Sequence, residues 1–341
     1  MTYNMKKITF LALVMLGCLG LTSCNDEWND ELYEQMVSFK SQVGSNGVYD
    51  VYMRYHADGS ARYELSVIVS GSQSNKHDIT VNIGVDNDTL NMLNQVKFAV
   101  NRQDLWYKQL PEQYYNLDTT TCTIPAGQDV ALFPVKFNMK GIDLSDEWVL
   151  PLTIEPSPDY KLNTRKGWYK ALMHVKLFND FSGTYSANTL NAYIDDGQEK
   201  DPATESTREA KVINDSTIFV YAGTIWDEDV NRKIYEVAIR ILPGTKNEDG
   251  AITGPVEVWL RHPNDKVDFK VTGACSYYYK AQPHETKPNI ERRQMTIYLN
   301  YKFTDYTTDP SNPLRYHVKG NMSMERLYNM LIPDADQAIL W

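Results

Sequence analysis

A tryptophan beside acidic residues is the most suggestive chemical group in this sequence. Trp226 is followed directly by Asp227, Glu228 and Asp229, in a turn between two strand-like segments. An aromatic face can stack on the C–H groups of a sugar ring, and carboxylates can bind its hydroxyls. We therefore interpret Trp226 and Asp227 as candidate carbohydrate-binding residues. A calcium site is the less favoured alternative, because the short loop lacks the spaced acids of a dedicated calcium loop.

Alternation along later segments places four more rings on strand faces. In 254–261 the aliphatic residues share one face, which leaves Trp259 on the opposite, polar face. Tyr298 takes the equivalent position in a later strand, and Tyr277 and Tyr279 share one face of theirs. These rings form either a sugar-binding platform or the inner lining of a barrel, and the pattern leaves both alternatives open.

The composition agrees with recognition more than with metal or thiol chemistry. The chain has 23 Tyr and 7 Trp, but only 6 His and 4 Cys. Aromatic residues suit half-buried pleated surfaces and ligand-binding faces. The formal net charge of −10 argues against a nucleic-acid partner, because phosphate binding requires a concentrated basic surface.

Signatures of catalysis are missing. The sequence contains no His-Glu-x-x-His, Gly-x-Ser-x-Gly or Cys-x-x-Cys motif and no phosphate-binding glycine loop. The histidines lack the spacing of metal ligands, so we predict neither a metal site nor a cofactor. Cys122 and Cys275 fall in different expected domains, which predicts two separate buried thiols. A glycosidase requires two carboxylates at a fixed separation; the 44 acidic residues leave such a pair open, but we predict a protein that is not an enzyme.

Two all-β domains are expected to position these residues. From 36 to 178, about seven short strand candidates with Pro and Gly turns predict an immunoglobulin-like sandwich, interrupted by one helix near 88–100. From 179 to 341, roughly eight strands predict an antiparallel barrel-like or second sandwich domain, which is the expected ligand domain. The terminal segment 338–341 is expected to be the closing strand.

The N-terminus has the layout of a bacterial lipoprotein signal. A short basic start precedes an apolar run over 8–21, which is shorter than the roughly 20 residues that a spanning helix needs. The run ends at 21–24, whose Leu-Thr-Ser-Cys sequence resembles the lipobox. We therefore predict a signal peptide over 1–23 and a lipid anchor on Cys24. An ordinary signal peptide with an incidental cysteine is the alternative.

An acidic tether over 24–35 is expected to follow the anchor. Its residues 25–31 resemble the export signal that sends lipoproteins of Bacteroides-type bacteria to the outer face of the outer membrane. A solvated tether without that role is the alternative. The resemblance implies an outer-membrane, cell-surface location through the lipid on Cys24.

Four motifs in order carry a family resemblance. They are Asp78-Ile79-Thr80-Val81 through Val85-Asp86, Leu110-Pro111-Glu112-Gln113-Tyr114-Tyr115, Thr123-Ile124-Pro125-Ala126-Gly127 and Val149-Leu150-Pro151-Leu152-Thr153-Ile154. Over 36–178 the chain resembles the N-terminal domain of unknown function of Bacteroidota surface lipoproteins, which also precedes some family 18 glycosidase domains. The region after it resembles the usual C-terminal β companion domain. The resemblance implies a component of a glycan-utilisation locus that holds oligosaccharides beside an outer-membrane importer.

Together these observations favour a non-catalytic surface lipoprotein that binds an oligosaccharide or polysaccharide by aromatic stacking. The candidate binding residues are Trp226, Asp227, Trp259, Tyr277, Tyr279 and Tyr298. The alternative is a structural or adhesive cell-surface subunit that binds no sugar, in which the rings are buried and strand edges make the contacts. The expected partners are a glycan and an importer complex, and the lipid anchor attaches the protein to the membrane.

Overall fold

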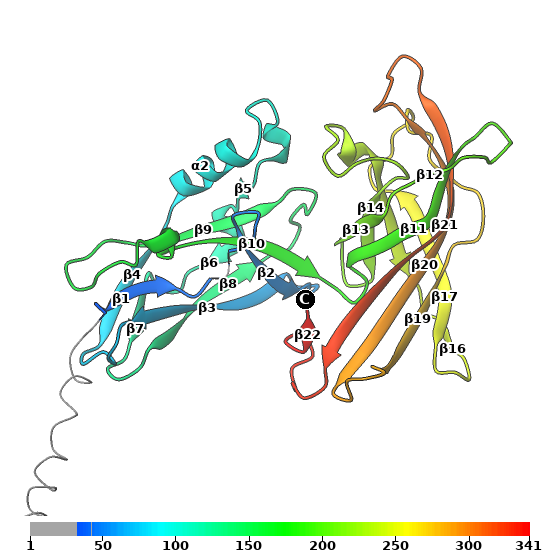
Figure 1. Ribbon diagram of the computed structural model, residues 1–341. Helices are drawn as coiled ribbons and strands as arrows, with labels where there is room; N and C mark the ends of the chain where they lie inside the picture. The colour runs from blue at the N-terminus through cyan, green and yellow to red at the C-terminus, as the bar shows by residue number, and fades with distance from the viewer. Residues whose placement is uncertain (1–32, 42) are drawn as a thin grey trace, which may run out of the picture.

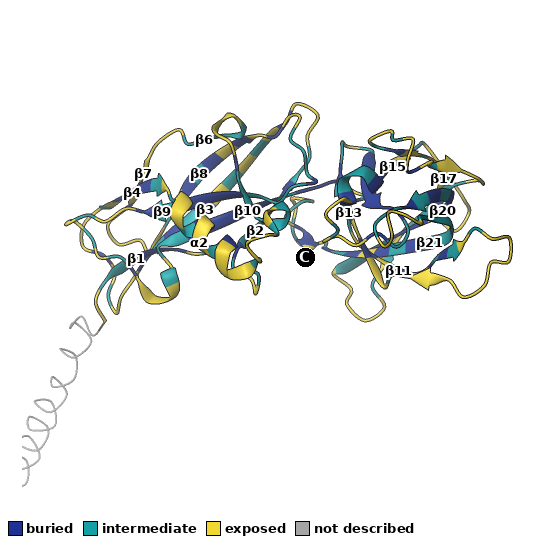
Figure 2. Ribbon diagram, turned by 90° about the horizontal axis from the view of Figure 1, so that it is seen from above, coloured by how far each residue is buried: buried dark blue, intermediate teal, exposed yellow. Residues whose placement is uncertain are grey.

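The chain folds into two β domains that lie side by side (Figure 1). The computed structural model describes residues 33–41 and 43–341. The predicted signal over 1–23, the anchor Cys24 and the acidic run 25–31 lie outside the described residues. Within the described part of the chain, no helix combines the length and apolarity needed to cross a membrane. Seen from above, buried strands run through the centre of both domains (Figure 2).

Two sheets packed against each other form the first domain. One has the strand order β1–β3–β8–β6, with the bounds Met36–Phe39, Ser60–Ser70, Val130–Asn138 and Tyr115–Asn116. The other has the order β2–β10–β9–β4–β7, with the bounds Tyr49–Arg54, Lys170–Phe178, Trp148–Ile154, Ile79–Val85 and Thr121–Ile124. The short strand β5 (Lys108–Gln109) pairs with β9.

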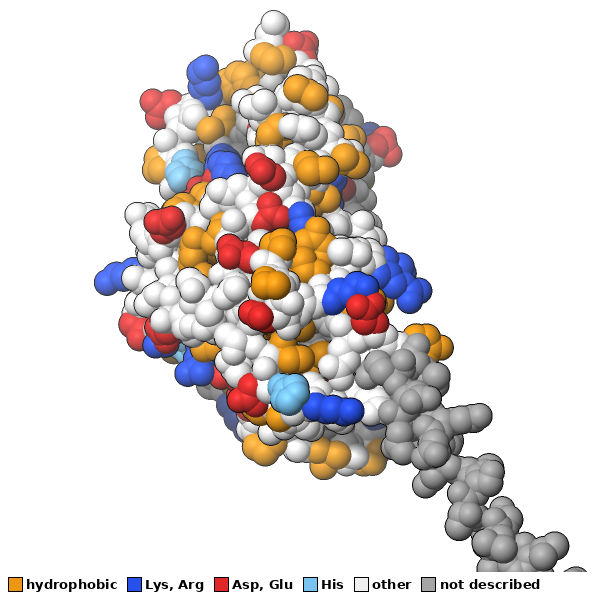
Figure 3. Space-filling view, turned by 90° about the vertical axis from the view of Figure 1, so that its left-hand side faces the viewer, with side chains coloured by type: hydrophobic (Ala, Val, Ile, Leu, Met, Phe, Trp, Pro, Cys, Tyr) orange, Lys and Arg blue, Asp and Glu red, His pale blue; other side chains and the backbone are white. Residues whose placement is uncertain are grey.

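The alternation of apolar residues explains why these strands form a sandwich. Leu65 and Phe133 from the first sheet and Leu150 from the second are buried in one shared core, because alternate side chains point to the same face. The expected sandwich is therefore confirmed. At the end of the sandwich that faces away from the barrel, acidic, basic and hydrophobic side chains are interspersed (Figure 3).

One helix, α2 (Asn87–Lys97), packs on β9. The carboxylate of Asp86 accepts a hydrogen bond from the backbone N–H of Thr89 at 3.2 Å and so caps the helix. Leu90 is buried beneath it. The helix ends before the expected Val100, because the backbone of Phe98 is extended. The chain also has the short 3-10 helices η1 (Gln103–Leu105), η2 (Glu112–Tyr114), η3 (Arg165–Gly167) and η4 (Arg232–Tyr235).

The second domain is a closed antiparallel barrel, which confirms the expected class. Its strands follow the order β11–β13–β14–β15–β17–β19–β20–β21, and β21 pairs with β11 to close the ring. Their bounds are Gly183–Ile194, Thr207–Val212, Thr217–Tyr221, Glu236–Ile241, Ile252–Leu260, Ser276–Pro283, Ile290–Asp305 and Leu314–Asn329. Short strands flank the ring: β12 (Ala203–Thr204), β16 (Thr245–Lys246), β18 (Lys270–Val271) and β22 (Ile339–Leu340).

The closing strand of the barrel differs from the expected one. The terminal strand β22 pairs with Leu327 and Tyr328 near the end of β21 and takes no part in closure. The long strand β21, absent from the expected set, closes the barrel instead. Its apolar pattern is interrupted by Gly320, whose backbone has a φ of 130° and where a Cβ atom would lie 1.9 Å from the carbonyl oxygen of Thr189 on β11. Only glycine permits this close approach of two strands.

The two cysteines of the described domains are both free, as expected. Cys122 is buried in the sandwich core, where desolvation raises the pKa of its thiol. Cys275 is half-buried and packs against the barrel core. The thiols therefore act as small apolar groups in two separate cores.

Candidate functional site

The six residues expected to bind sugar lie in three separate places. Trp226 and Asp227 occupy the loop after β14, which faces the sandwich. The other four lie on the barrel itself, two on its outer wall and two inside one of its ends. The chain therefore does not bring all six together on one platform.

The loop after β14 forms part of the contact between the domains. Arg102 of the sandwich donates a hydrogen bond to the carbonyl oxygen of Glu228. Desolvation raises the pKa of the Asp227 carboxyl, and the charges of Arg208 and Lys211 oppose this. The Trp226 ring is 69% exposed. It is available to a ligand but stands outside both hollows described below.

The outer wall of the barrel carries two exposed rings. Trp259 and Tyr298 are 38% and 43% exposed, as the alternation predicts. Their strands β17 and β20 are separated by β19. The guanidinium of Arg240 lies 5.7 Å from the centroid of the Trp259 ring and pairs with Glu257. The two rings therefore lie on strands of the outer wall that are not neighbours.

Tyr277 corrects the platform interpretation. It is only 6% exposed, because its ring fills the space beside two glycines. A Cβ atom on Gly254 would lie 2.7 Å from Tyr277 Cε1, and one on Gly244 would lie 2.4 Å from its hydroxyl oxygen. Tyr277 and Tyr279 do line the same pocket, but this pocket is at the inner face of the barrel. Of the two alternatives, the inner lining holds for this pair.

The mouth of the barrel next to the domain junction contains a pocket of about 260 Å³. Apolar and aromatic side chains form most of its wall: Phe181, Ile252, Tyr279, Met295, Met324 and Tyr328. Charged groups are few: Asp180, Arg293 and Arg326. An apolar wall with a few polar groups is the usual composition of a small-molecule site, and barrel mouths are among its preferred locations.

Tyr279 is the ring of this pocket that remains open to a ligand. It is half-buried, and desolvation raises the pKa of its hydroxyl. Among the residues that the structure describes, no other ring stacks on it. The Tyr328 ring, by contrast, is covered by the guanidinium of Arg293 at 3.7 Å from its centroid. Glu291 holds that guanidinium at 2.6 Å.

Arg326 is the unusual charge of the barrel mouth. It is 6% exposed and donates hydrogen bonds to the carbonyl oxygens of Asn179 at 3.0 Å and Ser182 at 2.6 Å. Its guanidinium lies over the rings of Phe178 and Trp341, 5.7 and 5.1 Å from their centroids. Within the described ranges it pairs with no carboxylate. Carbonyl oxygens and ring faces thus stabilise this buried cation.

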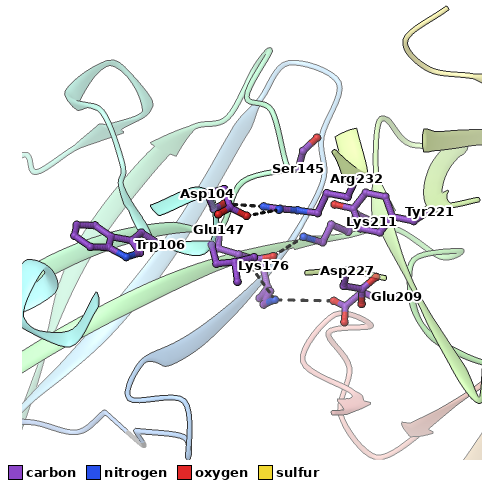
Figure 4. Close-up of a pocket in the computed structure, with 11 residues that line it drawn as sticks. Asp104, Trp106, Ser145, Glu147, Lys176, Glu209, Lys211, Tyr221, Asp227 and Arg232 are labelled. Atoms are coloured by element: carbon purple, nitrogen blue, oxygen red, sulfur yellow. Dashed lines mark hydrogen bonds and ion pairs between the residues drawn. The ribbon is translucent and has the colours of Figure 1, made fainter. Parts of the chain in front are cut away.

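A second hollow, of about 120 Å³, lies between the two domains (Figure 4). Glu147 of the sandwich is at its centre and pairs with Lys211 on β13 of the barrel. The same carboxylate lies 3.3 Å from Lys176 Nζ and 2.7 Å from His174 Nε2. The other ring nitrogen of His174 lies 2.7 Å from Asp50. A single carboxylate therefore joins both domains.

Most charges of this interdomain cavity are paired with an opposite charge. Desolvation alone would raise the pKa of Glu147, but the charge of Lys211 and the hydrogen bond with His174 hold it well below its usual value. Arg232 of the barrel binds the carboxylate and the carbonyl of Asp104 at 3.1 and 2.7 Å. Throughout residues 33–41 and 43–341, no group of three or more His, Cys, Asp or Glu is arranged to hold a metal ion.

The residues of the mouth pocket that sequence reasoning missed come from the connection between the domains and from strands β17, β20 and β21. Phe181 lies in the connection between the domains, and Arg326 and Tyr328 lie on β21. A usable signal was present, because Met322, Met324, Arg326 and Tyr328 occupy alternate positions of β21 and are all buried. Because Arg326 stands among these inward positions, a search for alternating apolar residues does not recognise the strand.

The fold and the pocket define a protein of two β domains with a ligand-sized barrel mouth, and comparison with known proteins identifies its class. Residues 28–158 match the domain of unknown function DUF4973, and residues 169–323 match a BT3507-like C-terminal domain. No curated protein matches the chain.

Solved structures from Bacteroides share both the fold and the sequence. A multidomain protein including DUF1735 from Bacteroides ovatus is 35% identical, with a TM-score of 0.78 over 89% of this chain and 99% of that chain. An auxiliary nutrient binding protein (BT3507) from Bacteroides thetaiotaomicron is 30% identical, with a TM-score of 0.77 over 89% and 98% of the two chains. The chain belongs to this family of two-domain Bacteroidota proteins, which confirms the resemblance carried by the four motifs.

Proposed function

We propose that this protein is a non-catalytic binder of an oligosaccharide or polysaccharide and that its barrel mouth takes one sugar ring. The mouth pocket carries the proposal, because it sets the half-buried ring of Tyr279 near the charged groups of Asp180 and Arg293. The ring offers an apolar face to sugar C–H groups, and the charged groups bind hydroxyls. The 30% identical relative named an auxiliary nutrient binding protein supports a role in nutrient binding.

The size of the pocket favours a single ring. Its volume of about 260 Å³ is slightly below the roughly 300–1,000 Å³ of pockets that enclose drug-sized ligands. A longer saccharide would therefore leave most of its units outside the pocket. This agrees with a binder that holds one end or one branch of a glycan.

The carboxylates of the pocket argue against hydrolysis. Hydrolysis of a glycoside generally needs two carboxylates on either side of the bond. Asp180 is the one carboxylate among the described residues that line the pocket. It is engaged by Arg54, whose Nη1 lies 3.0 Å from its Oδ1. Binding without turnover is the function that this arrangement supports.

The proposed function includes display at the cell surface through a lipid on Cys24. Acyl chains on one residue would hold the protein at the outer membrane, and attachment beside an importer would raise the local concentration of glycan. A Cys24→Ser variant tests the anchor: we expect it to leave the membrane fraction of the cells. Labelling of intact cells with an antibody then tests whether the unmodified protein is exposed. A variant that stays with the membrane contradicts the anchor.

Calorimetry against a panel of glycans tests the binding function. The probes are host N-glycans, mucin O-glycans, starch, mannan, xylan and pectin, added to the mature chain carrying Cys24→Ser. We expect at least one probe to bind with a Kd below about 1 mM, which corresponds to roughly −4 kcal/mol. The absence of binding by every probe at millimolar concentration would overturn the proposal.

A pair of matched tyrosine variants tests the location of the site. Tyr279→Ala should weaken binding of the positive probe about tenfold or more, because truncation of a central aromatic contact typically costs more than about 1.4 kcal/mol. Tyr298→Ala, which removes an exposed ring from the outer wall, should leave binding unchanged. The reverse result would place the site on the outer wall and not in the mouth.

A further inference from the structure

A larger groove lies on the sandwich side of the domain junction. It has a volume of about 710 Å³ and runs between strands β2 and β3 and the terminal segment that carries β22, which lies beside β2 in Figure 1. Five Phe, Tyr and Trp rings line it: Tyr49, Tyr52, Tyr63, Phe178 and Trp341. The groove is thus almost three times as large as the mouth pocket and has a similar supply of aromatic groups.

Two of these rings are held in place before any ligand arrives. Tyr52 and Trp341 stack with their centroids 4.0 Å apart and their planes 11° from parallel. The guanidinium of Arg326 also lies over the Trp341 ring, 5.1 Å from its centroid. Because little side-chain freedom remains to be lost, such a rigid aromatic ledge binds a ligand at low entropic cost.

The groove also carries polar groups that can reach sugar hydroxyls. Arg62 and Glu64 form an ion pair of 2.7 Å, and their side chains are 58% and 43% exposed. His56 and Gln337 are exposed beside them. Bidentate and charge-assisted hydrogen bonds to vicinal hydroxyls are within the capacity of these groups.

The mouth pocket and the groove share a wall. Arg54 lines the groove, and its guanidinium binds Asp180 of the pocket at 3.0 Å. Arg326 lines the pocket, and it lies over Phe178 and Trp341, which line the groove. Asp180 and Trp341 are both well exposed, with 57% of the Asp180 side chain and 55% of Trp341 open to solvent. A ligand can therefore cross the wall at its solvent side.

We propose that the ligand is a chain of sugar units with one unit in the barrel mouth and further units in the groove. This inference rests on the proposed function and adds the length of the ligand and a second subsite on the sandwich. The pocket encloses one ring, the shared wall marks the point where the chain crosses, and the groove accommodates the units that follow. Both domains then contact one ligand, which gives their junction a role in binding.

A length series tests this inference. The probes are the monosaccharides and the two-, four- and six-unit oligosaccharides of glucose, mannose, xylose and galacturonic acid, measured by calorimetry with the Cys24→Ser chain. We expect the six-unit form of the bound sugar to bind about tenfold or more tightly than its monosaccharide, since one additional contact of ordinary strength is worth about 1.4 kcal/mol. Equal affinity at all lengths would overturn the inference.

Variants of two matched ion pairs test whether the gain in affinity with ligand length comes from the groove. Arg62→Ala with Glu64→Ala removes the groove pair, and Arg240→Ala with Glu257→Ala removes a similarly exposed pair on the outer barrel wall. The groove variant should lose most of the gain with length and keep its affinity for the monosaccharide, whereas the wall variant should keep both. A groove variant that retains the full gain overturns the second subsite.

The outcomes separate this inference from the proposed function. If none of the probes binds, including the panel of larger glycans, the proposed function fails and the chain-binding inference fails with it. If Tyr279→Ala abolishes binding but the affinity does not depend on length, the proposed function stands and the chain-binding inference fails. The exposed ion pair of the groove has no role in the core, so both double variants should remain folded by circular dichroism.

Discussion

The barrel mouth and the interdomain cavity are two hollows of this molecule that differ in what they leave open to a ligand. In the cavity, Glu147 pairs with Lys211, Lys176 and His174, so the charge of this central carboxylate is satisfied within the protein. In the mouth, an open tyrosine ring and a buried arginine without a carboxylate partner face a mostly apolar pocket. The first arrangement centres on a carboxylate whose partners are within the protein, and the second leaves the Tyr279 ring open to a ligand.

We infer from this difference, and not from volume or polarity, that the cavity has a structural role and the mouth a binding role. A buried charge that is already paired gains little from a ligand and loses its partner if the ligand competes. A ring with an open face gains from stacking without breaking any contact. We therefore expect variants of the cavity to change stability and variants of the mouth to change binding.

Glu147→Ala is expected to have the largest effect. It leaves Lys211, Lys176 and His174 without their shared carboxylate at the contact between the domains. The free energy of unfolding should fall by about 2–4 kcal/mol, near or below the usual range for breaking a buried pair, because the Glu147 side chain is 31% exposed. The measurement is the midpoint of urea unfolding, followed by tryptophan fluorescence. Glycan affinity at low urea should not change.

Glu209→Ala is the matched control for this prediction. Its carboxylate also lines the interdomain cavity, but it lies 3.9 Å from Lys176 and is 44% exposed. A pair of this kind contributes about 0–1 kcal/mol. Equal losses of unfolding free energy in the two variants would mean that the Glu147 network is not the main polar link between the domains. The structural role of the cavity would then be wrong.

Gly254→Ala is expected to have an intermediate effect, and it acts on the mouth. The added Cβ atom would lie 2.7 Å from Tyr277 Cε1 and 2.8 Å from the Cα of Gly244. Crowding of this kind costs about 1–3 kcal/mol. Because Tyr277 forms part of the pocket wall, its displacement should also weaken glycan binding. This variant therefore changes both properties, unlike Glu147→Ala.

Thr253→Ala provides the neighbouring control. Thr253 is exposed on the same strand, and surface substitutions of this kind usually change stability by less than about 0.5 kcal/mol. Thermal unfolding and calorimetry of both variants give the comparison. If Gly254→Ala weakens stability without any change in binding, the Tyr277 side of the pocket does not contact the glycan.

The fold was largely predictable because alternation and turn residues are local signals. Trp259 and Tyr298 lie on the exposed side of their strands, as their neighbours in sequence indicate. The closure of the barrel was not predictable in this way, since it depends on the pairing of β11 with β21, which are far apart in the chain. Gly320 and Arg326 interrupt the apolar pattern of β21, so the strand that completes the mouth does not resemble a core strand.

The candidate site was less predictable, because alternation does not indicate which ring keeps a face open to a ligand. Alternation indicates which face of a strand carries Tyr277 and Tyr279, and the pair indeed shares one face. It does not indicate that Gly244 and Gly254 leave room for Tyr277 to become buried while Tyr279 keeps an open face. That distinction arises from the packing of β19 against β17 and its neighbouring turn, which is a property of the tertiary structure.

Asp143→Asn is expected to have the smallest effect and to depend on pH. Ser145 donates two hydrogen bonds to Asp143 Oδ1, from its N–H at 3.1 Å and its hydroxyl at 2.7 Å. Arg261 of the barrel lies 3.2 Å from the same carboxylate. Desolvation would raise the pKa of Asp143, but the Ser145 bonds and the charges of Arg261 and Lys233 lower it to about 2.

The direction of the pH dependence follows from this lowered pKa. The folded state binds the Asp143 proton more weakly than the unfolded state, whose value is near 3.8, so the carboxylate stabilises the fold above about pH 4. That contribution is lost as the pH falls toward 2. We expect Asp143→Asn to lower stability by less than about 1 kcal/mol at pH 6, because the side chain is 43% exposed. The difference from the unmodified protein should shrink at pH 3.

Asp129→Asn is the control for the pH dependence and for the whole comparison. Asp129 is exposed on the sandwich, and among the described residues its carboxylate has no hydrogen bond or ion pair. Because its substitution removes no contact, the urea midpoint should change little at either pH. If Asp143→Asn behaves in the same way, the ionic contacts across the junction add no pH-dependent stability. If instead the glycan affinity of Asp143→Asn follows the pH, charge at the junction also acts on the mouth, and the division between a structural cavity and a binding pocket is wrong.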